Sequence, residues 1–495
     1  MTMTTDATTT SSHGAPATPQ IIQGGMGVGV SDWHLARAVS RLGQLGVVSG
    51  TALDVLMARR LQRGDADGSV RRALAAFPAP RVAEWIIDAY FVEGGIEPDA
   101  PFRAVPRHTI KSPARLVELT AAANFVEVYL AKEGHDGVVG INYLRKVDVP
   151  IPFSLYGAML AGVDYVLMGA GSPAELPGLA RALSRHEEVT LEVKVGGARP
   201  AEGLGNVVFD PRTILEEPGA PLTTPKAIAI VASSDLANML HRNEEFRPDG
   251  FVIEGPSAGG HNAPPRGPRR TDEIGQPIYG ERDEVDLSVI LELGLPVWLA
   301  GSYGTPERFR EARAMGASGI QVGTAFAYCE ESGFDQSIKD RVRATLANGG
   351  PDVRADWRVS PTGFPFRVVD LPDTLTDQAV IDARQKVCDL GALRTAYKRE
   401  DGKVDYRCPA EPVDHYLRKG GREANIEGRV CLCNALFASA GYPQRRKSGY
   451  VEPPIVTSGG DLAPVQALIE RANGGTYAAA DVIAYLLGEG AQSAQ

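Results

Sequence analysis

The stretch PVWLAGSYGTPERFREARAMGASGIQVGT, residues 296–324, decides the fold class of this chain. It begins with an apolar run, residues 296–301, which is too short for a helix and apolar throughout, as a strand buried on both faces should be. An amphipathic segment follows at Pro306 to Met315, with Thr305 as its expected N-cap and Pro306 at the first helical position. Because residues 319–324 form a second apolar run, the stretch predicts one strand–helix–strand unit.

Six more runs of this kind precede the unit, and each is followed by a glycine-rich turn and then a helical pattern. They are residues 21–26, 45–50, 138–142, 165–171, 227–233 and 250–255. Amphipathic stretches between the runs, such as Ser31 to Leu42 and Arg115 to Lys132, predict helices, the first with Ser31 as its N-cap. Eight alternations of strand and helix predict an α/β fold of the TIM (β/α)8 barrel type, with a doubly wound open sheet as the alternative.

The 495 residues exceed the roughly 250 of a simple barrel, so the chain has room for insertions and an extension. Residues 262–286 directly follow the sixth strand, where either a lid over the active-site face or a passive surface loop is expected. The predicted organisation is a disordered tail at 1–19, a barrel at 20–329 with insertions at about 59–109 and 262–286, a mostly helical region at 330–450, and a C-terminal tail at 451–495 with a helix near 481–487.

Composition excludes several classes of protein. The hydrophobic fraction of 43% and the charged fraction of 23% are those of a soluble globular protein. A net charge of -10 argues against a nucleic-acid partner, because phosphate binding requires a basic face. There is no run of about 18 apolar residues to cross a membrane and no signal peptide pattern in residues 1–19. Five cysteines are too few for a disulfide framework, so we expect a cytoplasmic protein.

Glycine-rich turns follow the last two predicted strands. Barrels often bind a phosphate group with the loops after strands 7 and 8, through backbone N–H groups. Glycine lets the backbone approach the phosphate oxygens, and Thr324 adds a hydroxyl donor. At the first strand, Gly25 to Gly29 lacks the full dinucleotide-binding spacing, and we interpret it as a turn that touches a flat ring. Tight turns without a ligand are the alternative for both glycine clusters.

His261 is the candidate catalytic residue. It follows the sixth strand within Glu254-Gly255-Pro256-Ser257-Ala258-Gly259-Gly260-His261, at the barrel rim where catalysis occurs in this fold. Because the ordinary pKa of histidine is about 6.5, such a side chain can take a proton at neutral pH. A solvated histidine with no role is the alternative that this pattern leaves open.

Several motifs together resemble the nitronate monooxygenase (2-nitropropane dioxygenase) family and the related FMN-dependent enoyl-ACP reductases. The similarity covers residues 20–330 and includes the opening strand Ile22 to Gly27 and the A-G-G-H segment at Ala258 to His261. Further matches are Asn142 in a G-V-N strand, Gly169 to Pro173 in a G-A-G-x-P loop, and Ala300 to Gly304, Gly316-Ala317 and Gln321 to Phe326 in the phosphate motif A-G-G-I…G-A…Q-x-G-T-x-F.

The sequence also departs from the compact members of this family. Ser302 and Tyr303 stand where the phosphate motif has its second glycine and its isoleucine. A serine hydroxyl can still face a phosphate group. The large insertions and the C-terminal extension are absent from the compact members. The segments Ser360 to Pro365 and Cys431 to Asn434 are similar to those of long members, which include enoyl reductase subunits of polyunsaturated-fatty-acid synthases.

The resemblance implies an FMN-dependent oxidoreductase that oxidises nitronates or nitroalkanes with dioxygen. It implies that His261 is the catalytic base. The implied FMN contacts are Gln23, Gly24, Gly25, Met26, Asn142, Gly169, Gly259, Gly260, Ala300, Gly301, Ser302, Gly323 and Thr324. The alternative is an NAD(P)H-dependent enoyl-thioester reductase that works with an acyl carrier protein. We expect a small-molecule substrate and, from the family, a homodimer.

No metal site is predicted. Cys408, His415, Cys431 and Cys433 lie near one another in the sequence, but their spacing differs from that of structural zinc sites. Buried structural thiols are the better interpretation.

Overall fold

The computed structural model describes residues 18–489, so residues 1–17 of the predicted disordered tail lie outside the described part. Its centre is an eight-stranded parallel sheet in the order β1-β12-β11-β9-β8-β4-β3-β2. A bridge between Ile22 and Leu45 joins the two end strands, which closes the sheet into a barrel. All eight predicted strands are confirmed: β1 Ile21–Gln23, β2 Gly46–Ser49, β3 Val139–Leu144, β4 Tyr165–Gly169, β8 Lys226–Val231, β9 Gly250–Glu254, β11 Val297–Ala300 and β12 Gly319–Val322.

The barrel interior is filled by apolar side chains from β1, β2, β4, β8, β9 and β11, together with Leu45 just before β2. Trp298 is the largest of them, and its indole N–H donates to the backbone oxygen of Pro19 at 2.8 Å. The set consists of Ile22, Leu45, Val47, Tyr165, Leu167, Ile228, Val252, Trp298 and Ala300. Because this interior is packed, ligand space is left only at the ends of the strands.

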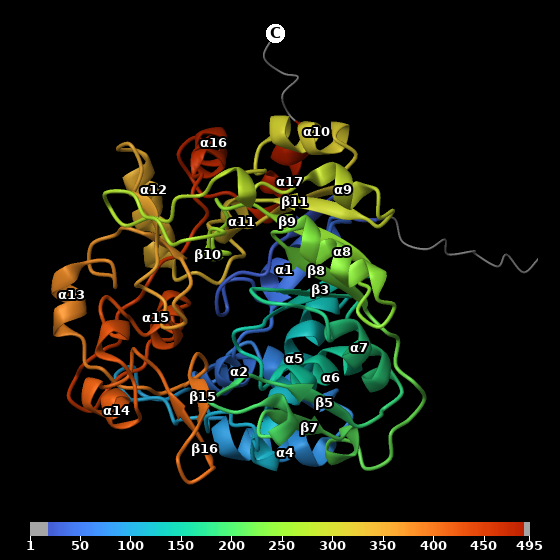
Figure 1. Cartoon of the computed structure of the whole chain (residues 1–495), viewed down its shortest axis with the longest axis vertical. Coiled ribbons are helices and arrows are strands. Elements are labelled where there is room, and N and C mark those ends of the chain that lie inside the picture. The colour runs from blue at the N-terminus through green and yellow to red at the C-terminus, as the bar shows by residue number, and fades with distance from the viewer. Residues whose placement is uncertain (1–17, 490–495) are drawn as a thin grey trace, which may run out of the picture.

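Helices surround the strands, and Figure 1 shows α4 to α8 along one flank of the molecule. The helices of the barrel part are α1 Trp33–Arg41, α2 Leu53–Gln62, α3 Ser69–Ala75, α4 Pro80–Tyr90, α5 Ala114–Lys132, α6 Ile151–Leu160, α7 Leu176–Ser184, α8 Ser234–Arg242, α9 Leu287–Leu291, α10 Pro306–Ala314 and α11 Thr324–Ala327. Thr305 caps α10 as expected. None of the helices between residues 18 and 489 is long and apolar enough to cross a lipid bilayer.

The N-cap of α1 differs from the prediction. Asp32 and not Ser31 is the cap, and the Asp32 side chain accepts hydrogen bonds from the backbone N–H groups of His34 and Leu35. The Ser31 hydroxyl is already used, because it accepts from the Met26 N–H at 2.9 Å and donates to the Gly24 carbonyl at 3.0 Å. Ser31 therefore stabilises the turn after β1, and the adjacent Asp32 caps the helix.

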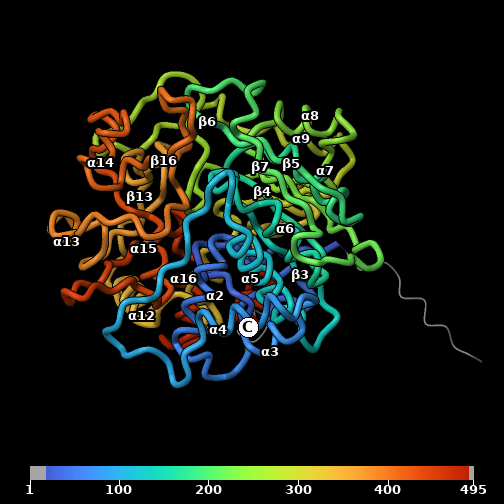
Figure 2. Tube along the Cα trace, turned by 90° about the horizontal axis from the view of Figure 1, so that it is seen from below, coloured from blue at the N-terminus to red at the C-terminus, as the bar shows by residue number. Residues whose placement is uncertain are grey.

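The C-terminal extension contains the expected helices and also short strands. Its elements are α12 Gln336–Leu346, β13 Val353–Asp356, β14 Phe366–Val369, α13 Gln378–Ala383, β15 Thr395–Lys398, β16 Val404–Arg407, α14 Val413–Arg418, α15 Leu432–Ser439, α16 Ala463–Arg471 and α17 Ala479–Leu487. In Figures 1 and 2 the orange α12 to α15 lie along the flank opposite α7 and α8. Helix α17 packs on α1 and α10, and α16 packs on α11 and α12.

Strands of the extension also pair with loop strands of the barrel. The loop strands are β5 Val189–Glu192, β6 Val195–Gly196, β7 Asn206–Phe209 and β10 Gly260–His261. Strand β14 pairs antiparallel with β10, and β15 pairs parallel with β6. The extension is therefore joined to the rim of the barrel by backbone hydrogen bonds, and one of these pairings directly includes His261.

Candidate active site

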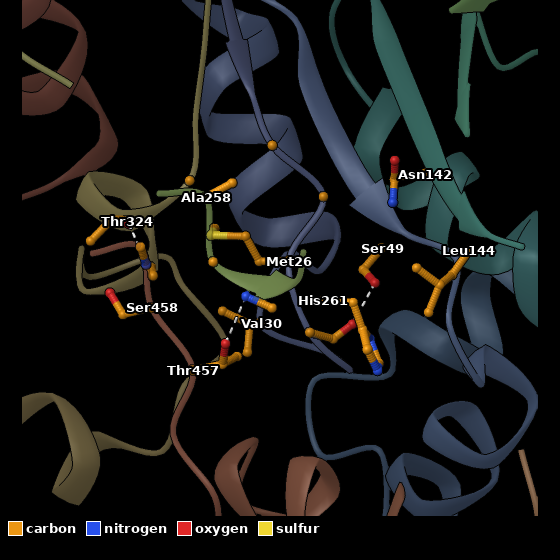
Figure 3. A pocket seen from close by; sticks show the side chains of 18 of the residues that line it. Met26, Val30, Ser49, Asn142, Leu144, Ala258, His261, Thr324, Thr457 and Ser458 are labelled. Carbon is orange, nitrogen blue, oxygen red and sulfur yellow. Dashed lines mark hydrogen bonds between the residues drawn. The ribbon is translucent and has the colours of Figure 1, made fainter. Parts of the chain in front are cut away.

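A cavity of about 270 Å³ opens at the carboxyl ends of the barrel strands. Most of the residues singled out in the sequence line it. They are Gly24, Gly25, Met26, Asn142, Gly169, Gly259, Gly260, His261, Ala300, Gly301, Ser302, Gly323 and Thr324. Figure 3 shows Thr324 at one end of this cavity, and Asn142 and His261 at the other. The topology thus brings together loops that are up to 300 residues apart, since parallel strands end at one rim.

Gln23 is the exception, because it is fully buried and does not line the cavity. Its side-chain amide nitrogen donates to the Ser31 hydroxyl at 2.9 Å, and its oxygen accepts from the Val47 N–H at 3.0 Å. The second of these bonds joins β1 to β2 at the place where the barrel closes. The structure therefore gives Gln23 a role in the fold and not the expected position against a flat ring.

The loop after β11 has a strained backbone at Ser302. Its φ is +59°, in the left-handed region that favours glycine, and the preceding Gly301 has φ +86°. The Ser302 hydroxyl donates to the Ser257 hydroxyl at 2.9 Å. A left-handed conformation costs a non-glycine residue about 1 kcal/mol. The loop therefore keeps the path that a second glycine would take.

His261 is held by residues of the C-terminal extension. Its Nε2 lies 2.7 Å from the Ser360 hydroxyl, and its ring meets Phe366 edge-to-face at 4.9 Å between centroids. Burial, with a smaller contribution from the charge of Lys146, lowers the pKa of His261 to about 3. The imidazole is therefore neutral at physiological pH, which makes it a weaker base than a solvated histidine.

A second cavity of about 270 Å³ lies against the same histidine. Glu254, Ala170, Ile230 and His261 line both cavities. Arg266, Tyr279 and Asp283, all from the 262–286 insertion, form part of the second wall. The insertion therefore borders the active-site end of the barrel, as the lid interpretation requires.

Two charged residues at this junction were not singled out in the sequence. Burial raises the pKa of Glu254 to about 7, against the opposing effect of the Lys146 charge. Burial also lowers the pKa of Lys146 to about 8. The Lys146 ammonium donates to the Ala170 carbonyl at 3.1 Å and lies 3.9 Å from the centre of the Phe364 ring. Both groups exchange protons near neutral pH because they are desolvated together.

The extension also supplies an apolar wall of the first cavity. Leu390 and Leu393 precede β15, and the other residues belong to α15. The wall consists of Leu390, Leu393, Leu432, Leu436 and Phe437, with Cys433 beside them. Sequence patterns could not identify these residues as cavity-lining, because leucine and phenylalanine in a helix are normally part of a core.

The cavity meets the requirements of a ligand with a flat polar ring and a phosphate group. Gln321 Oε1 and Ser458 Oγ are buried, line the cavity and have no hydrogen-bond partner among residues 18–489. Buried polar atoms are rarely unpaired, so both indicate a bound partner. A Cβ atom added to Gly260 would meet nothing within 4 Å, which leaves open space beside the backbone of the A-G-G-H segment. The residues present are therefore compatible with FMN.

Within the described part of the chain, no group of three or more His, Cys, Asp or Glu side chains is arranged to hold a metal ion. Cys408 and Cys431 pack against each other in a small core with Ala410, and Cys433 contacts it.

Two sequence comparisons match part of this chain to known proteins. Residues 217–348 match the family model described as nitronate monooxygenase. A probable nitronate monooxygenase of Staphylococcus haemolyticus (strain JCSC1435) is 29% identical over 116 residues, which are 23% of this chain. That match spans about a third of the relative's length, at 31%.

Two solved structures were also matched to most of this chain. Nitroalkane oxidase from Streptomyces ansochromogenes has a TM-score of 0.47 at 15% identity, with 96% of each chain covered. FabK from Thermotoga maritima has a TM-score of 0.37 at 19% identity, with 72% of each chain covered.

Proposed function

We propose, from the match of residues 217–348 to the nitronate monooxygenase family model, that this chain is an FMN-dependent oxidoreductase of that family that oxidises alkyl nitronates with dioxygen. The observation that carries the proposal is the neutral His261 at the cavity, between the glycine-lined strand ends and the apolar wall. A neutral imidazole suits a substrate that arrives already deprotonated and needs a hydrogen-bond donor.

In this proposal the loops after β11 and β12 hold the phosphate group of FMN, through Gly301, Ser302, Gly323 and Thr324. Gly24 to Met26, Asn142 and Gln321 face its ring system. Bound FMN would supply the redox chemistry by taking up electrons from the substrate. The protein supplies placement, hydrogen bonds and exclusion of water.

We assign one tautomer to His261 in this proposal. Its Nε2 lies 2.7 Å from the Ser360 hydroxyl, which we take as the donor, and this hydroxyl is in turn 2.8 Å from the Thr362 hydroxyl. The ring proton is then on Nδ1, which has no partner among the described residues, and it is free to donate to a nitronate oxygen. Because a base with a pKa near 3 removes a proton from carbon poorly, we propose the nitronate and not the neutral nitroalkane as the substrate.

Oxygen uptake tests this function. The FMN-loaded protein is supplied with nitronates of increasing alkyl length, without NADH or NADPH, and in parallel with the matching neutral nitroalkanes. We expect turnover of the nitronates and little or none of the nitroalkanes. A flavin-loaded protein that consumes no oxygen with any of the nitronates would overturn the proposal.

A second candidate function is reduction of an enoyl thioester with NAD(P)H. Two observations favour it. Lys146 and Glu254 have pKa values of about 8 and 7, as proton donors to a reduced double bond should have. The apolar wall offers space to an acyl chain. For this function an acyl carrier protein would be the partner. Loss of flavin absorbance on addition of NADPH, followed by recovery with an enoyl thioester, would select it over nitronate oxidation.

A further inference from the structure

We propose that residues 457–459 of the C-terminal tail complete the phosphate-binding end of the cavity, and that the Ser458 hydroxyl donates a hydrogen bond to the phosphate of FMN. The inference rests on the proposed use of FMN and adds a segment that lies more than 130 residues beyond β12. Figure 3 shows Ser458 and Thr324 at the same end of the cavity.

The tail lies between the two barrel loops that are expected to hold the phosphate. On one side the Gly459 N–H donates to the Thr324 hydroxyl at 3.0 Å. On the other side the Gly460 N–H donates to the Ser257 carbonyl at 2.9 Å, and the Ser257 side chain accepts from Ser302. Ser458 is thus next to the residues that contact both Thr324 and the Ser302 loop.

The tail is fixed in this place by close packing. A Cβ atom at Gly459 would lie 2.6 Å from the Thr324 hydroxyl oxygen, and one at Gly259 would lie 2.8 Å from the backbone carbon of Ser458. The Thr457 hydroxyl accepts from the Gly260 N–H at 2.9 Å and donates to the Arg367 carbonyl at 2.7 Å. Only glycine permits backbone contacts this close at positions 259 and 459. The tail and the A-G-G-H segment therefore pack directly against each other and form one continuous surface.

Ser458 has the burial and the position that are expected of a residue that contacts a ligand. The residue is 4% exposed and lines the cavity, and its hydroxyl has no hydrogen-bond partner among residues 18–489. The buried Tyr328 hydroxyl lies beside it, close enough for a weak hydrogen bond with Ser458, although this contact falls outside normal hydrogen-bond geometry. A serine hydroxyl can accept one hydrogen bond and donate another, so Ser458 can accept from Tyr328 while it donates into the cavity.

The hydroxyl and N–H groups at this end favour an anion. The Thr324 and Ser458 hydroxyls can donate, whereas the Ser302 hydroxyl already donates to Ser257, and phosphate oxygens only accept. The Arg367 guanidinium, which donates to the carbonyls of Pro256 and Ala258, lies close to Gly460 and adds positive charge. A phosphate group is therefore a better occupant here than the ring of the cofactor.

Riboflavin is the discriminating probe, because it is FMN without the phosphate. The dissociation constants of FMN and riboflavin are measured by flavin fluorescence for the wild-type protein and for Ser458→Ala. The matched control is Ser184→Ala, a buried serine that does not line the cavity. We expect Ser458→Ala to weaken FMN binding about tenfold, the effect of one hydrogen bond to a charged group, and to leave riboflavin binding unchanged.

A second variant helps to separate an effect on phosphate binding from an effect on folding. Gly459→Ala places a methyl group against the Thr324 hydroxyl, and it should also weaken FMN binding more than riboflavin binding. An unchanged ratio of FMN to riboflavin affinity in both variants would overturn the inference while the proposed function stands. If the wild-type protein binds neither flavin, the proposed function itself fails, and the inference fails with it.

Discussion

The Ser360 hydroxyl lies 2.7 Å from Nε2 of His261, although the two residues are 99 positions apart. Ser360 is fully buried and belongs to the C-terminal extension, whereas His261 lies on the barrel rim. The extension therefore orients the proposed catalytic histidine, both through this bond and through the pairing of β10 with β14. A barrel without the extension would present the same histidine with its tautomer and direction undefined.

Replacing Ser360 tests this relationship. In Ser360→Ala the Nε2 atom loses its donor, so the neutral ring can carry its proton on either nitrogen. We expect kcat/KM for a nitronate to fall about tenfold, as for the loss of one oriented hydrogen bond, while the dissociation constant of FMN stays unchanged. Ser184→Ala is again the control. Unchanged kinetics in Ser360→Ala would show that the hydroxyl does not orient His261.

The lowered pKa of His261 should make stability depend on pH. Its pKa of about 3 lies below the ordinary value, so between pH 6.5 and 3 the unfolded chain binds a proton that the folded protein does not. Its contribution to stability is fully present above pH 6.5 and is lost as the pH falls, by about 2 kcal/mol at pH 5. Urea unfolding at pH 7.5 and 5 should show a smaller loss for His261→Asn than for the wild type. Equal losses would contradict the lowered pKa.

Glu254 should have the opposite dependence. Its pKa is raised to about 7, so the folded protein holds a proton between pH 4.5 and 7 that the unfolded chain has released. Stability from this group is present below pH 4.5 and is lost as the pH rises to 7. We expect Glu254→Gln to be more stable than the wild type at pH 8 by about 3 kcal/mol, with little difference at pH 4.5. Glu84→Gln, at an exposed position of α4, should change stability at neither pH.

The apolar wall should set the preferred length of the substrate. Leu393 is 8% exposed and lines the cavity, so Leu393→Phe reduces the space at that end. We expect KM to rise severalfold for a hexyl nitronate and to change little for an ethyl nitronate, with kcat for the short substrate retained. Steady-state oxygen uptake measures both. An equal change for both lengths would indicate that the wall does not contact the substrate.

The barrel and its rim could be predicted from the sequence because their signals are local. A buried parallel strand is a short apolar run, and the turn after it lies next to it in the chain. The positions of His261 and Thr324 therefore follow from the strand before each of them, and that of Asn142 from the strand that contains it. The predicted contact of Gln23 with the ring is wrong. Gln23 is next to Gly24 in the sequence, but only Gly24 lines the cavity. Only the pairing of β1 with β2 explains why the Gln23 amide is used inside the fold.

The contribution of the extension could not be predicted in the same way. Leu393 and Ser458 line the cavity, and Ser360 contacts His261, only because the fold brings together segments that are far apart in the chain. No local pattern distinguishes a leucine that lines a cavity from one that packs in a core. Glu254 and Lys146 were missed for a related reason, since a charged residue at the end of a strand normally faces solvent and only the fold buries this pair.

The most direct test of the account is the visible absorption spectrum of the purified protein before and after incubation with FMN and gel filtration. We predict that flavin absorbance elutes with the protein at about one FMN per chain, because the cavity offers unpaired donors and acceptors to both ends of this cofactor. Addition of a nitronate in air should then consume oxygen without NAD(P)H. A protein that remains colourless after incubation with FMN would contradict the central claim and leave only the barrel.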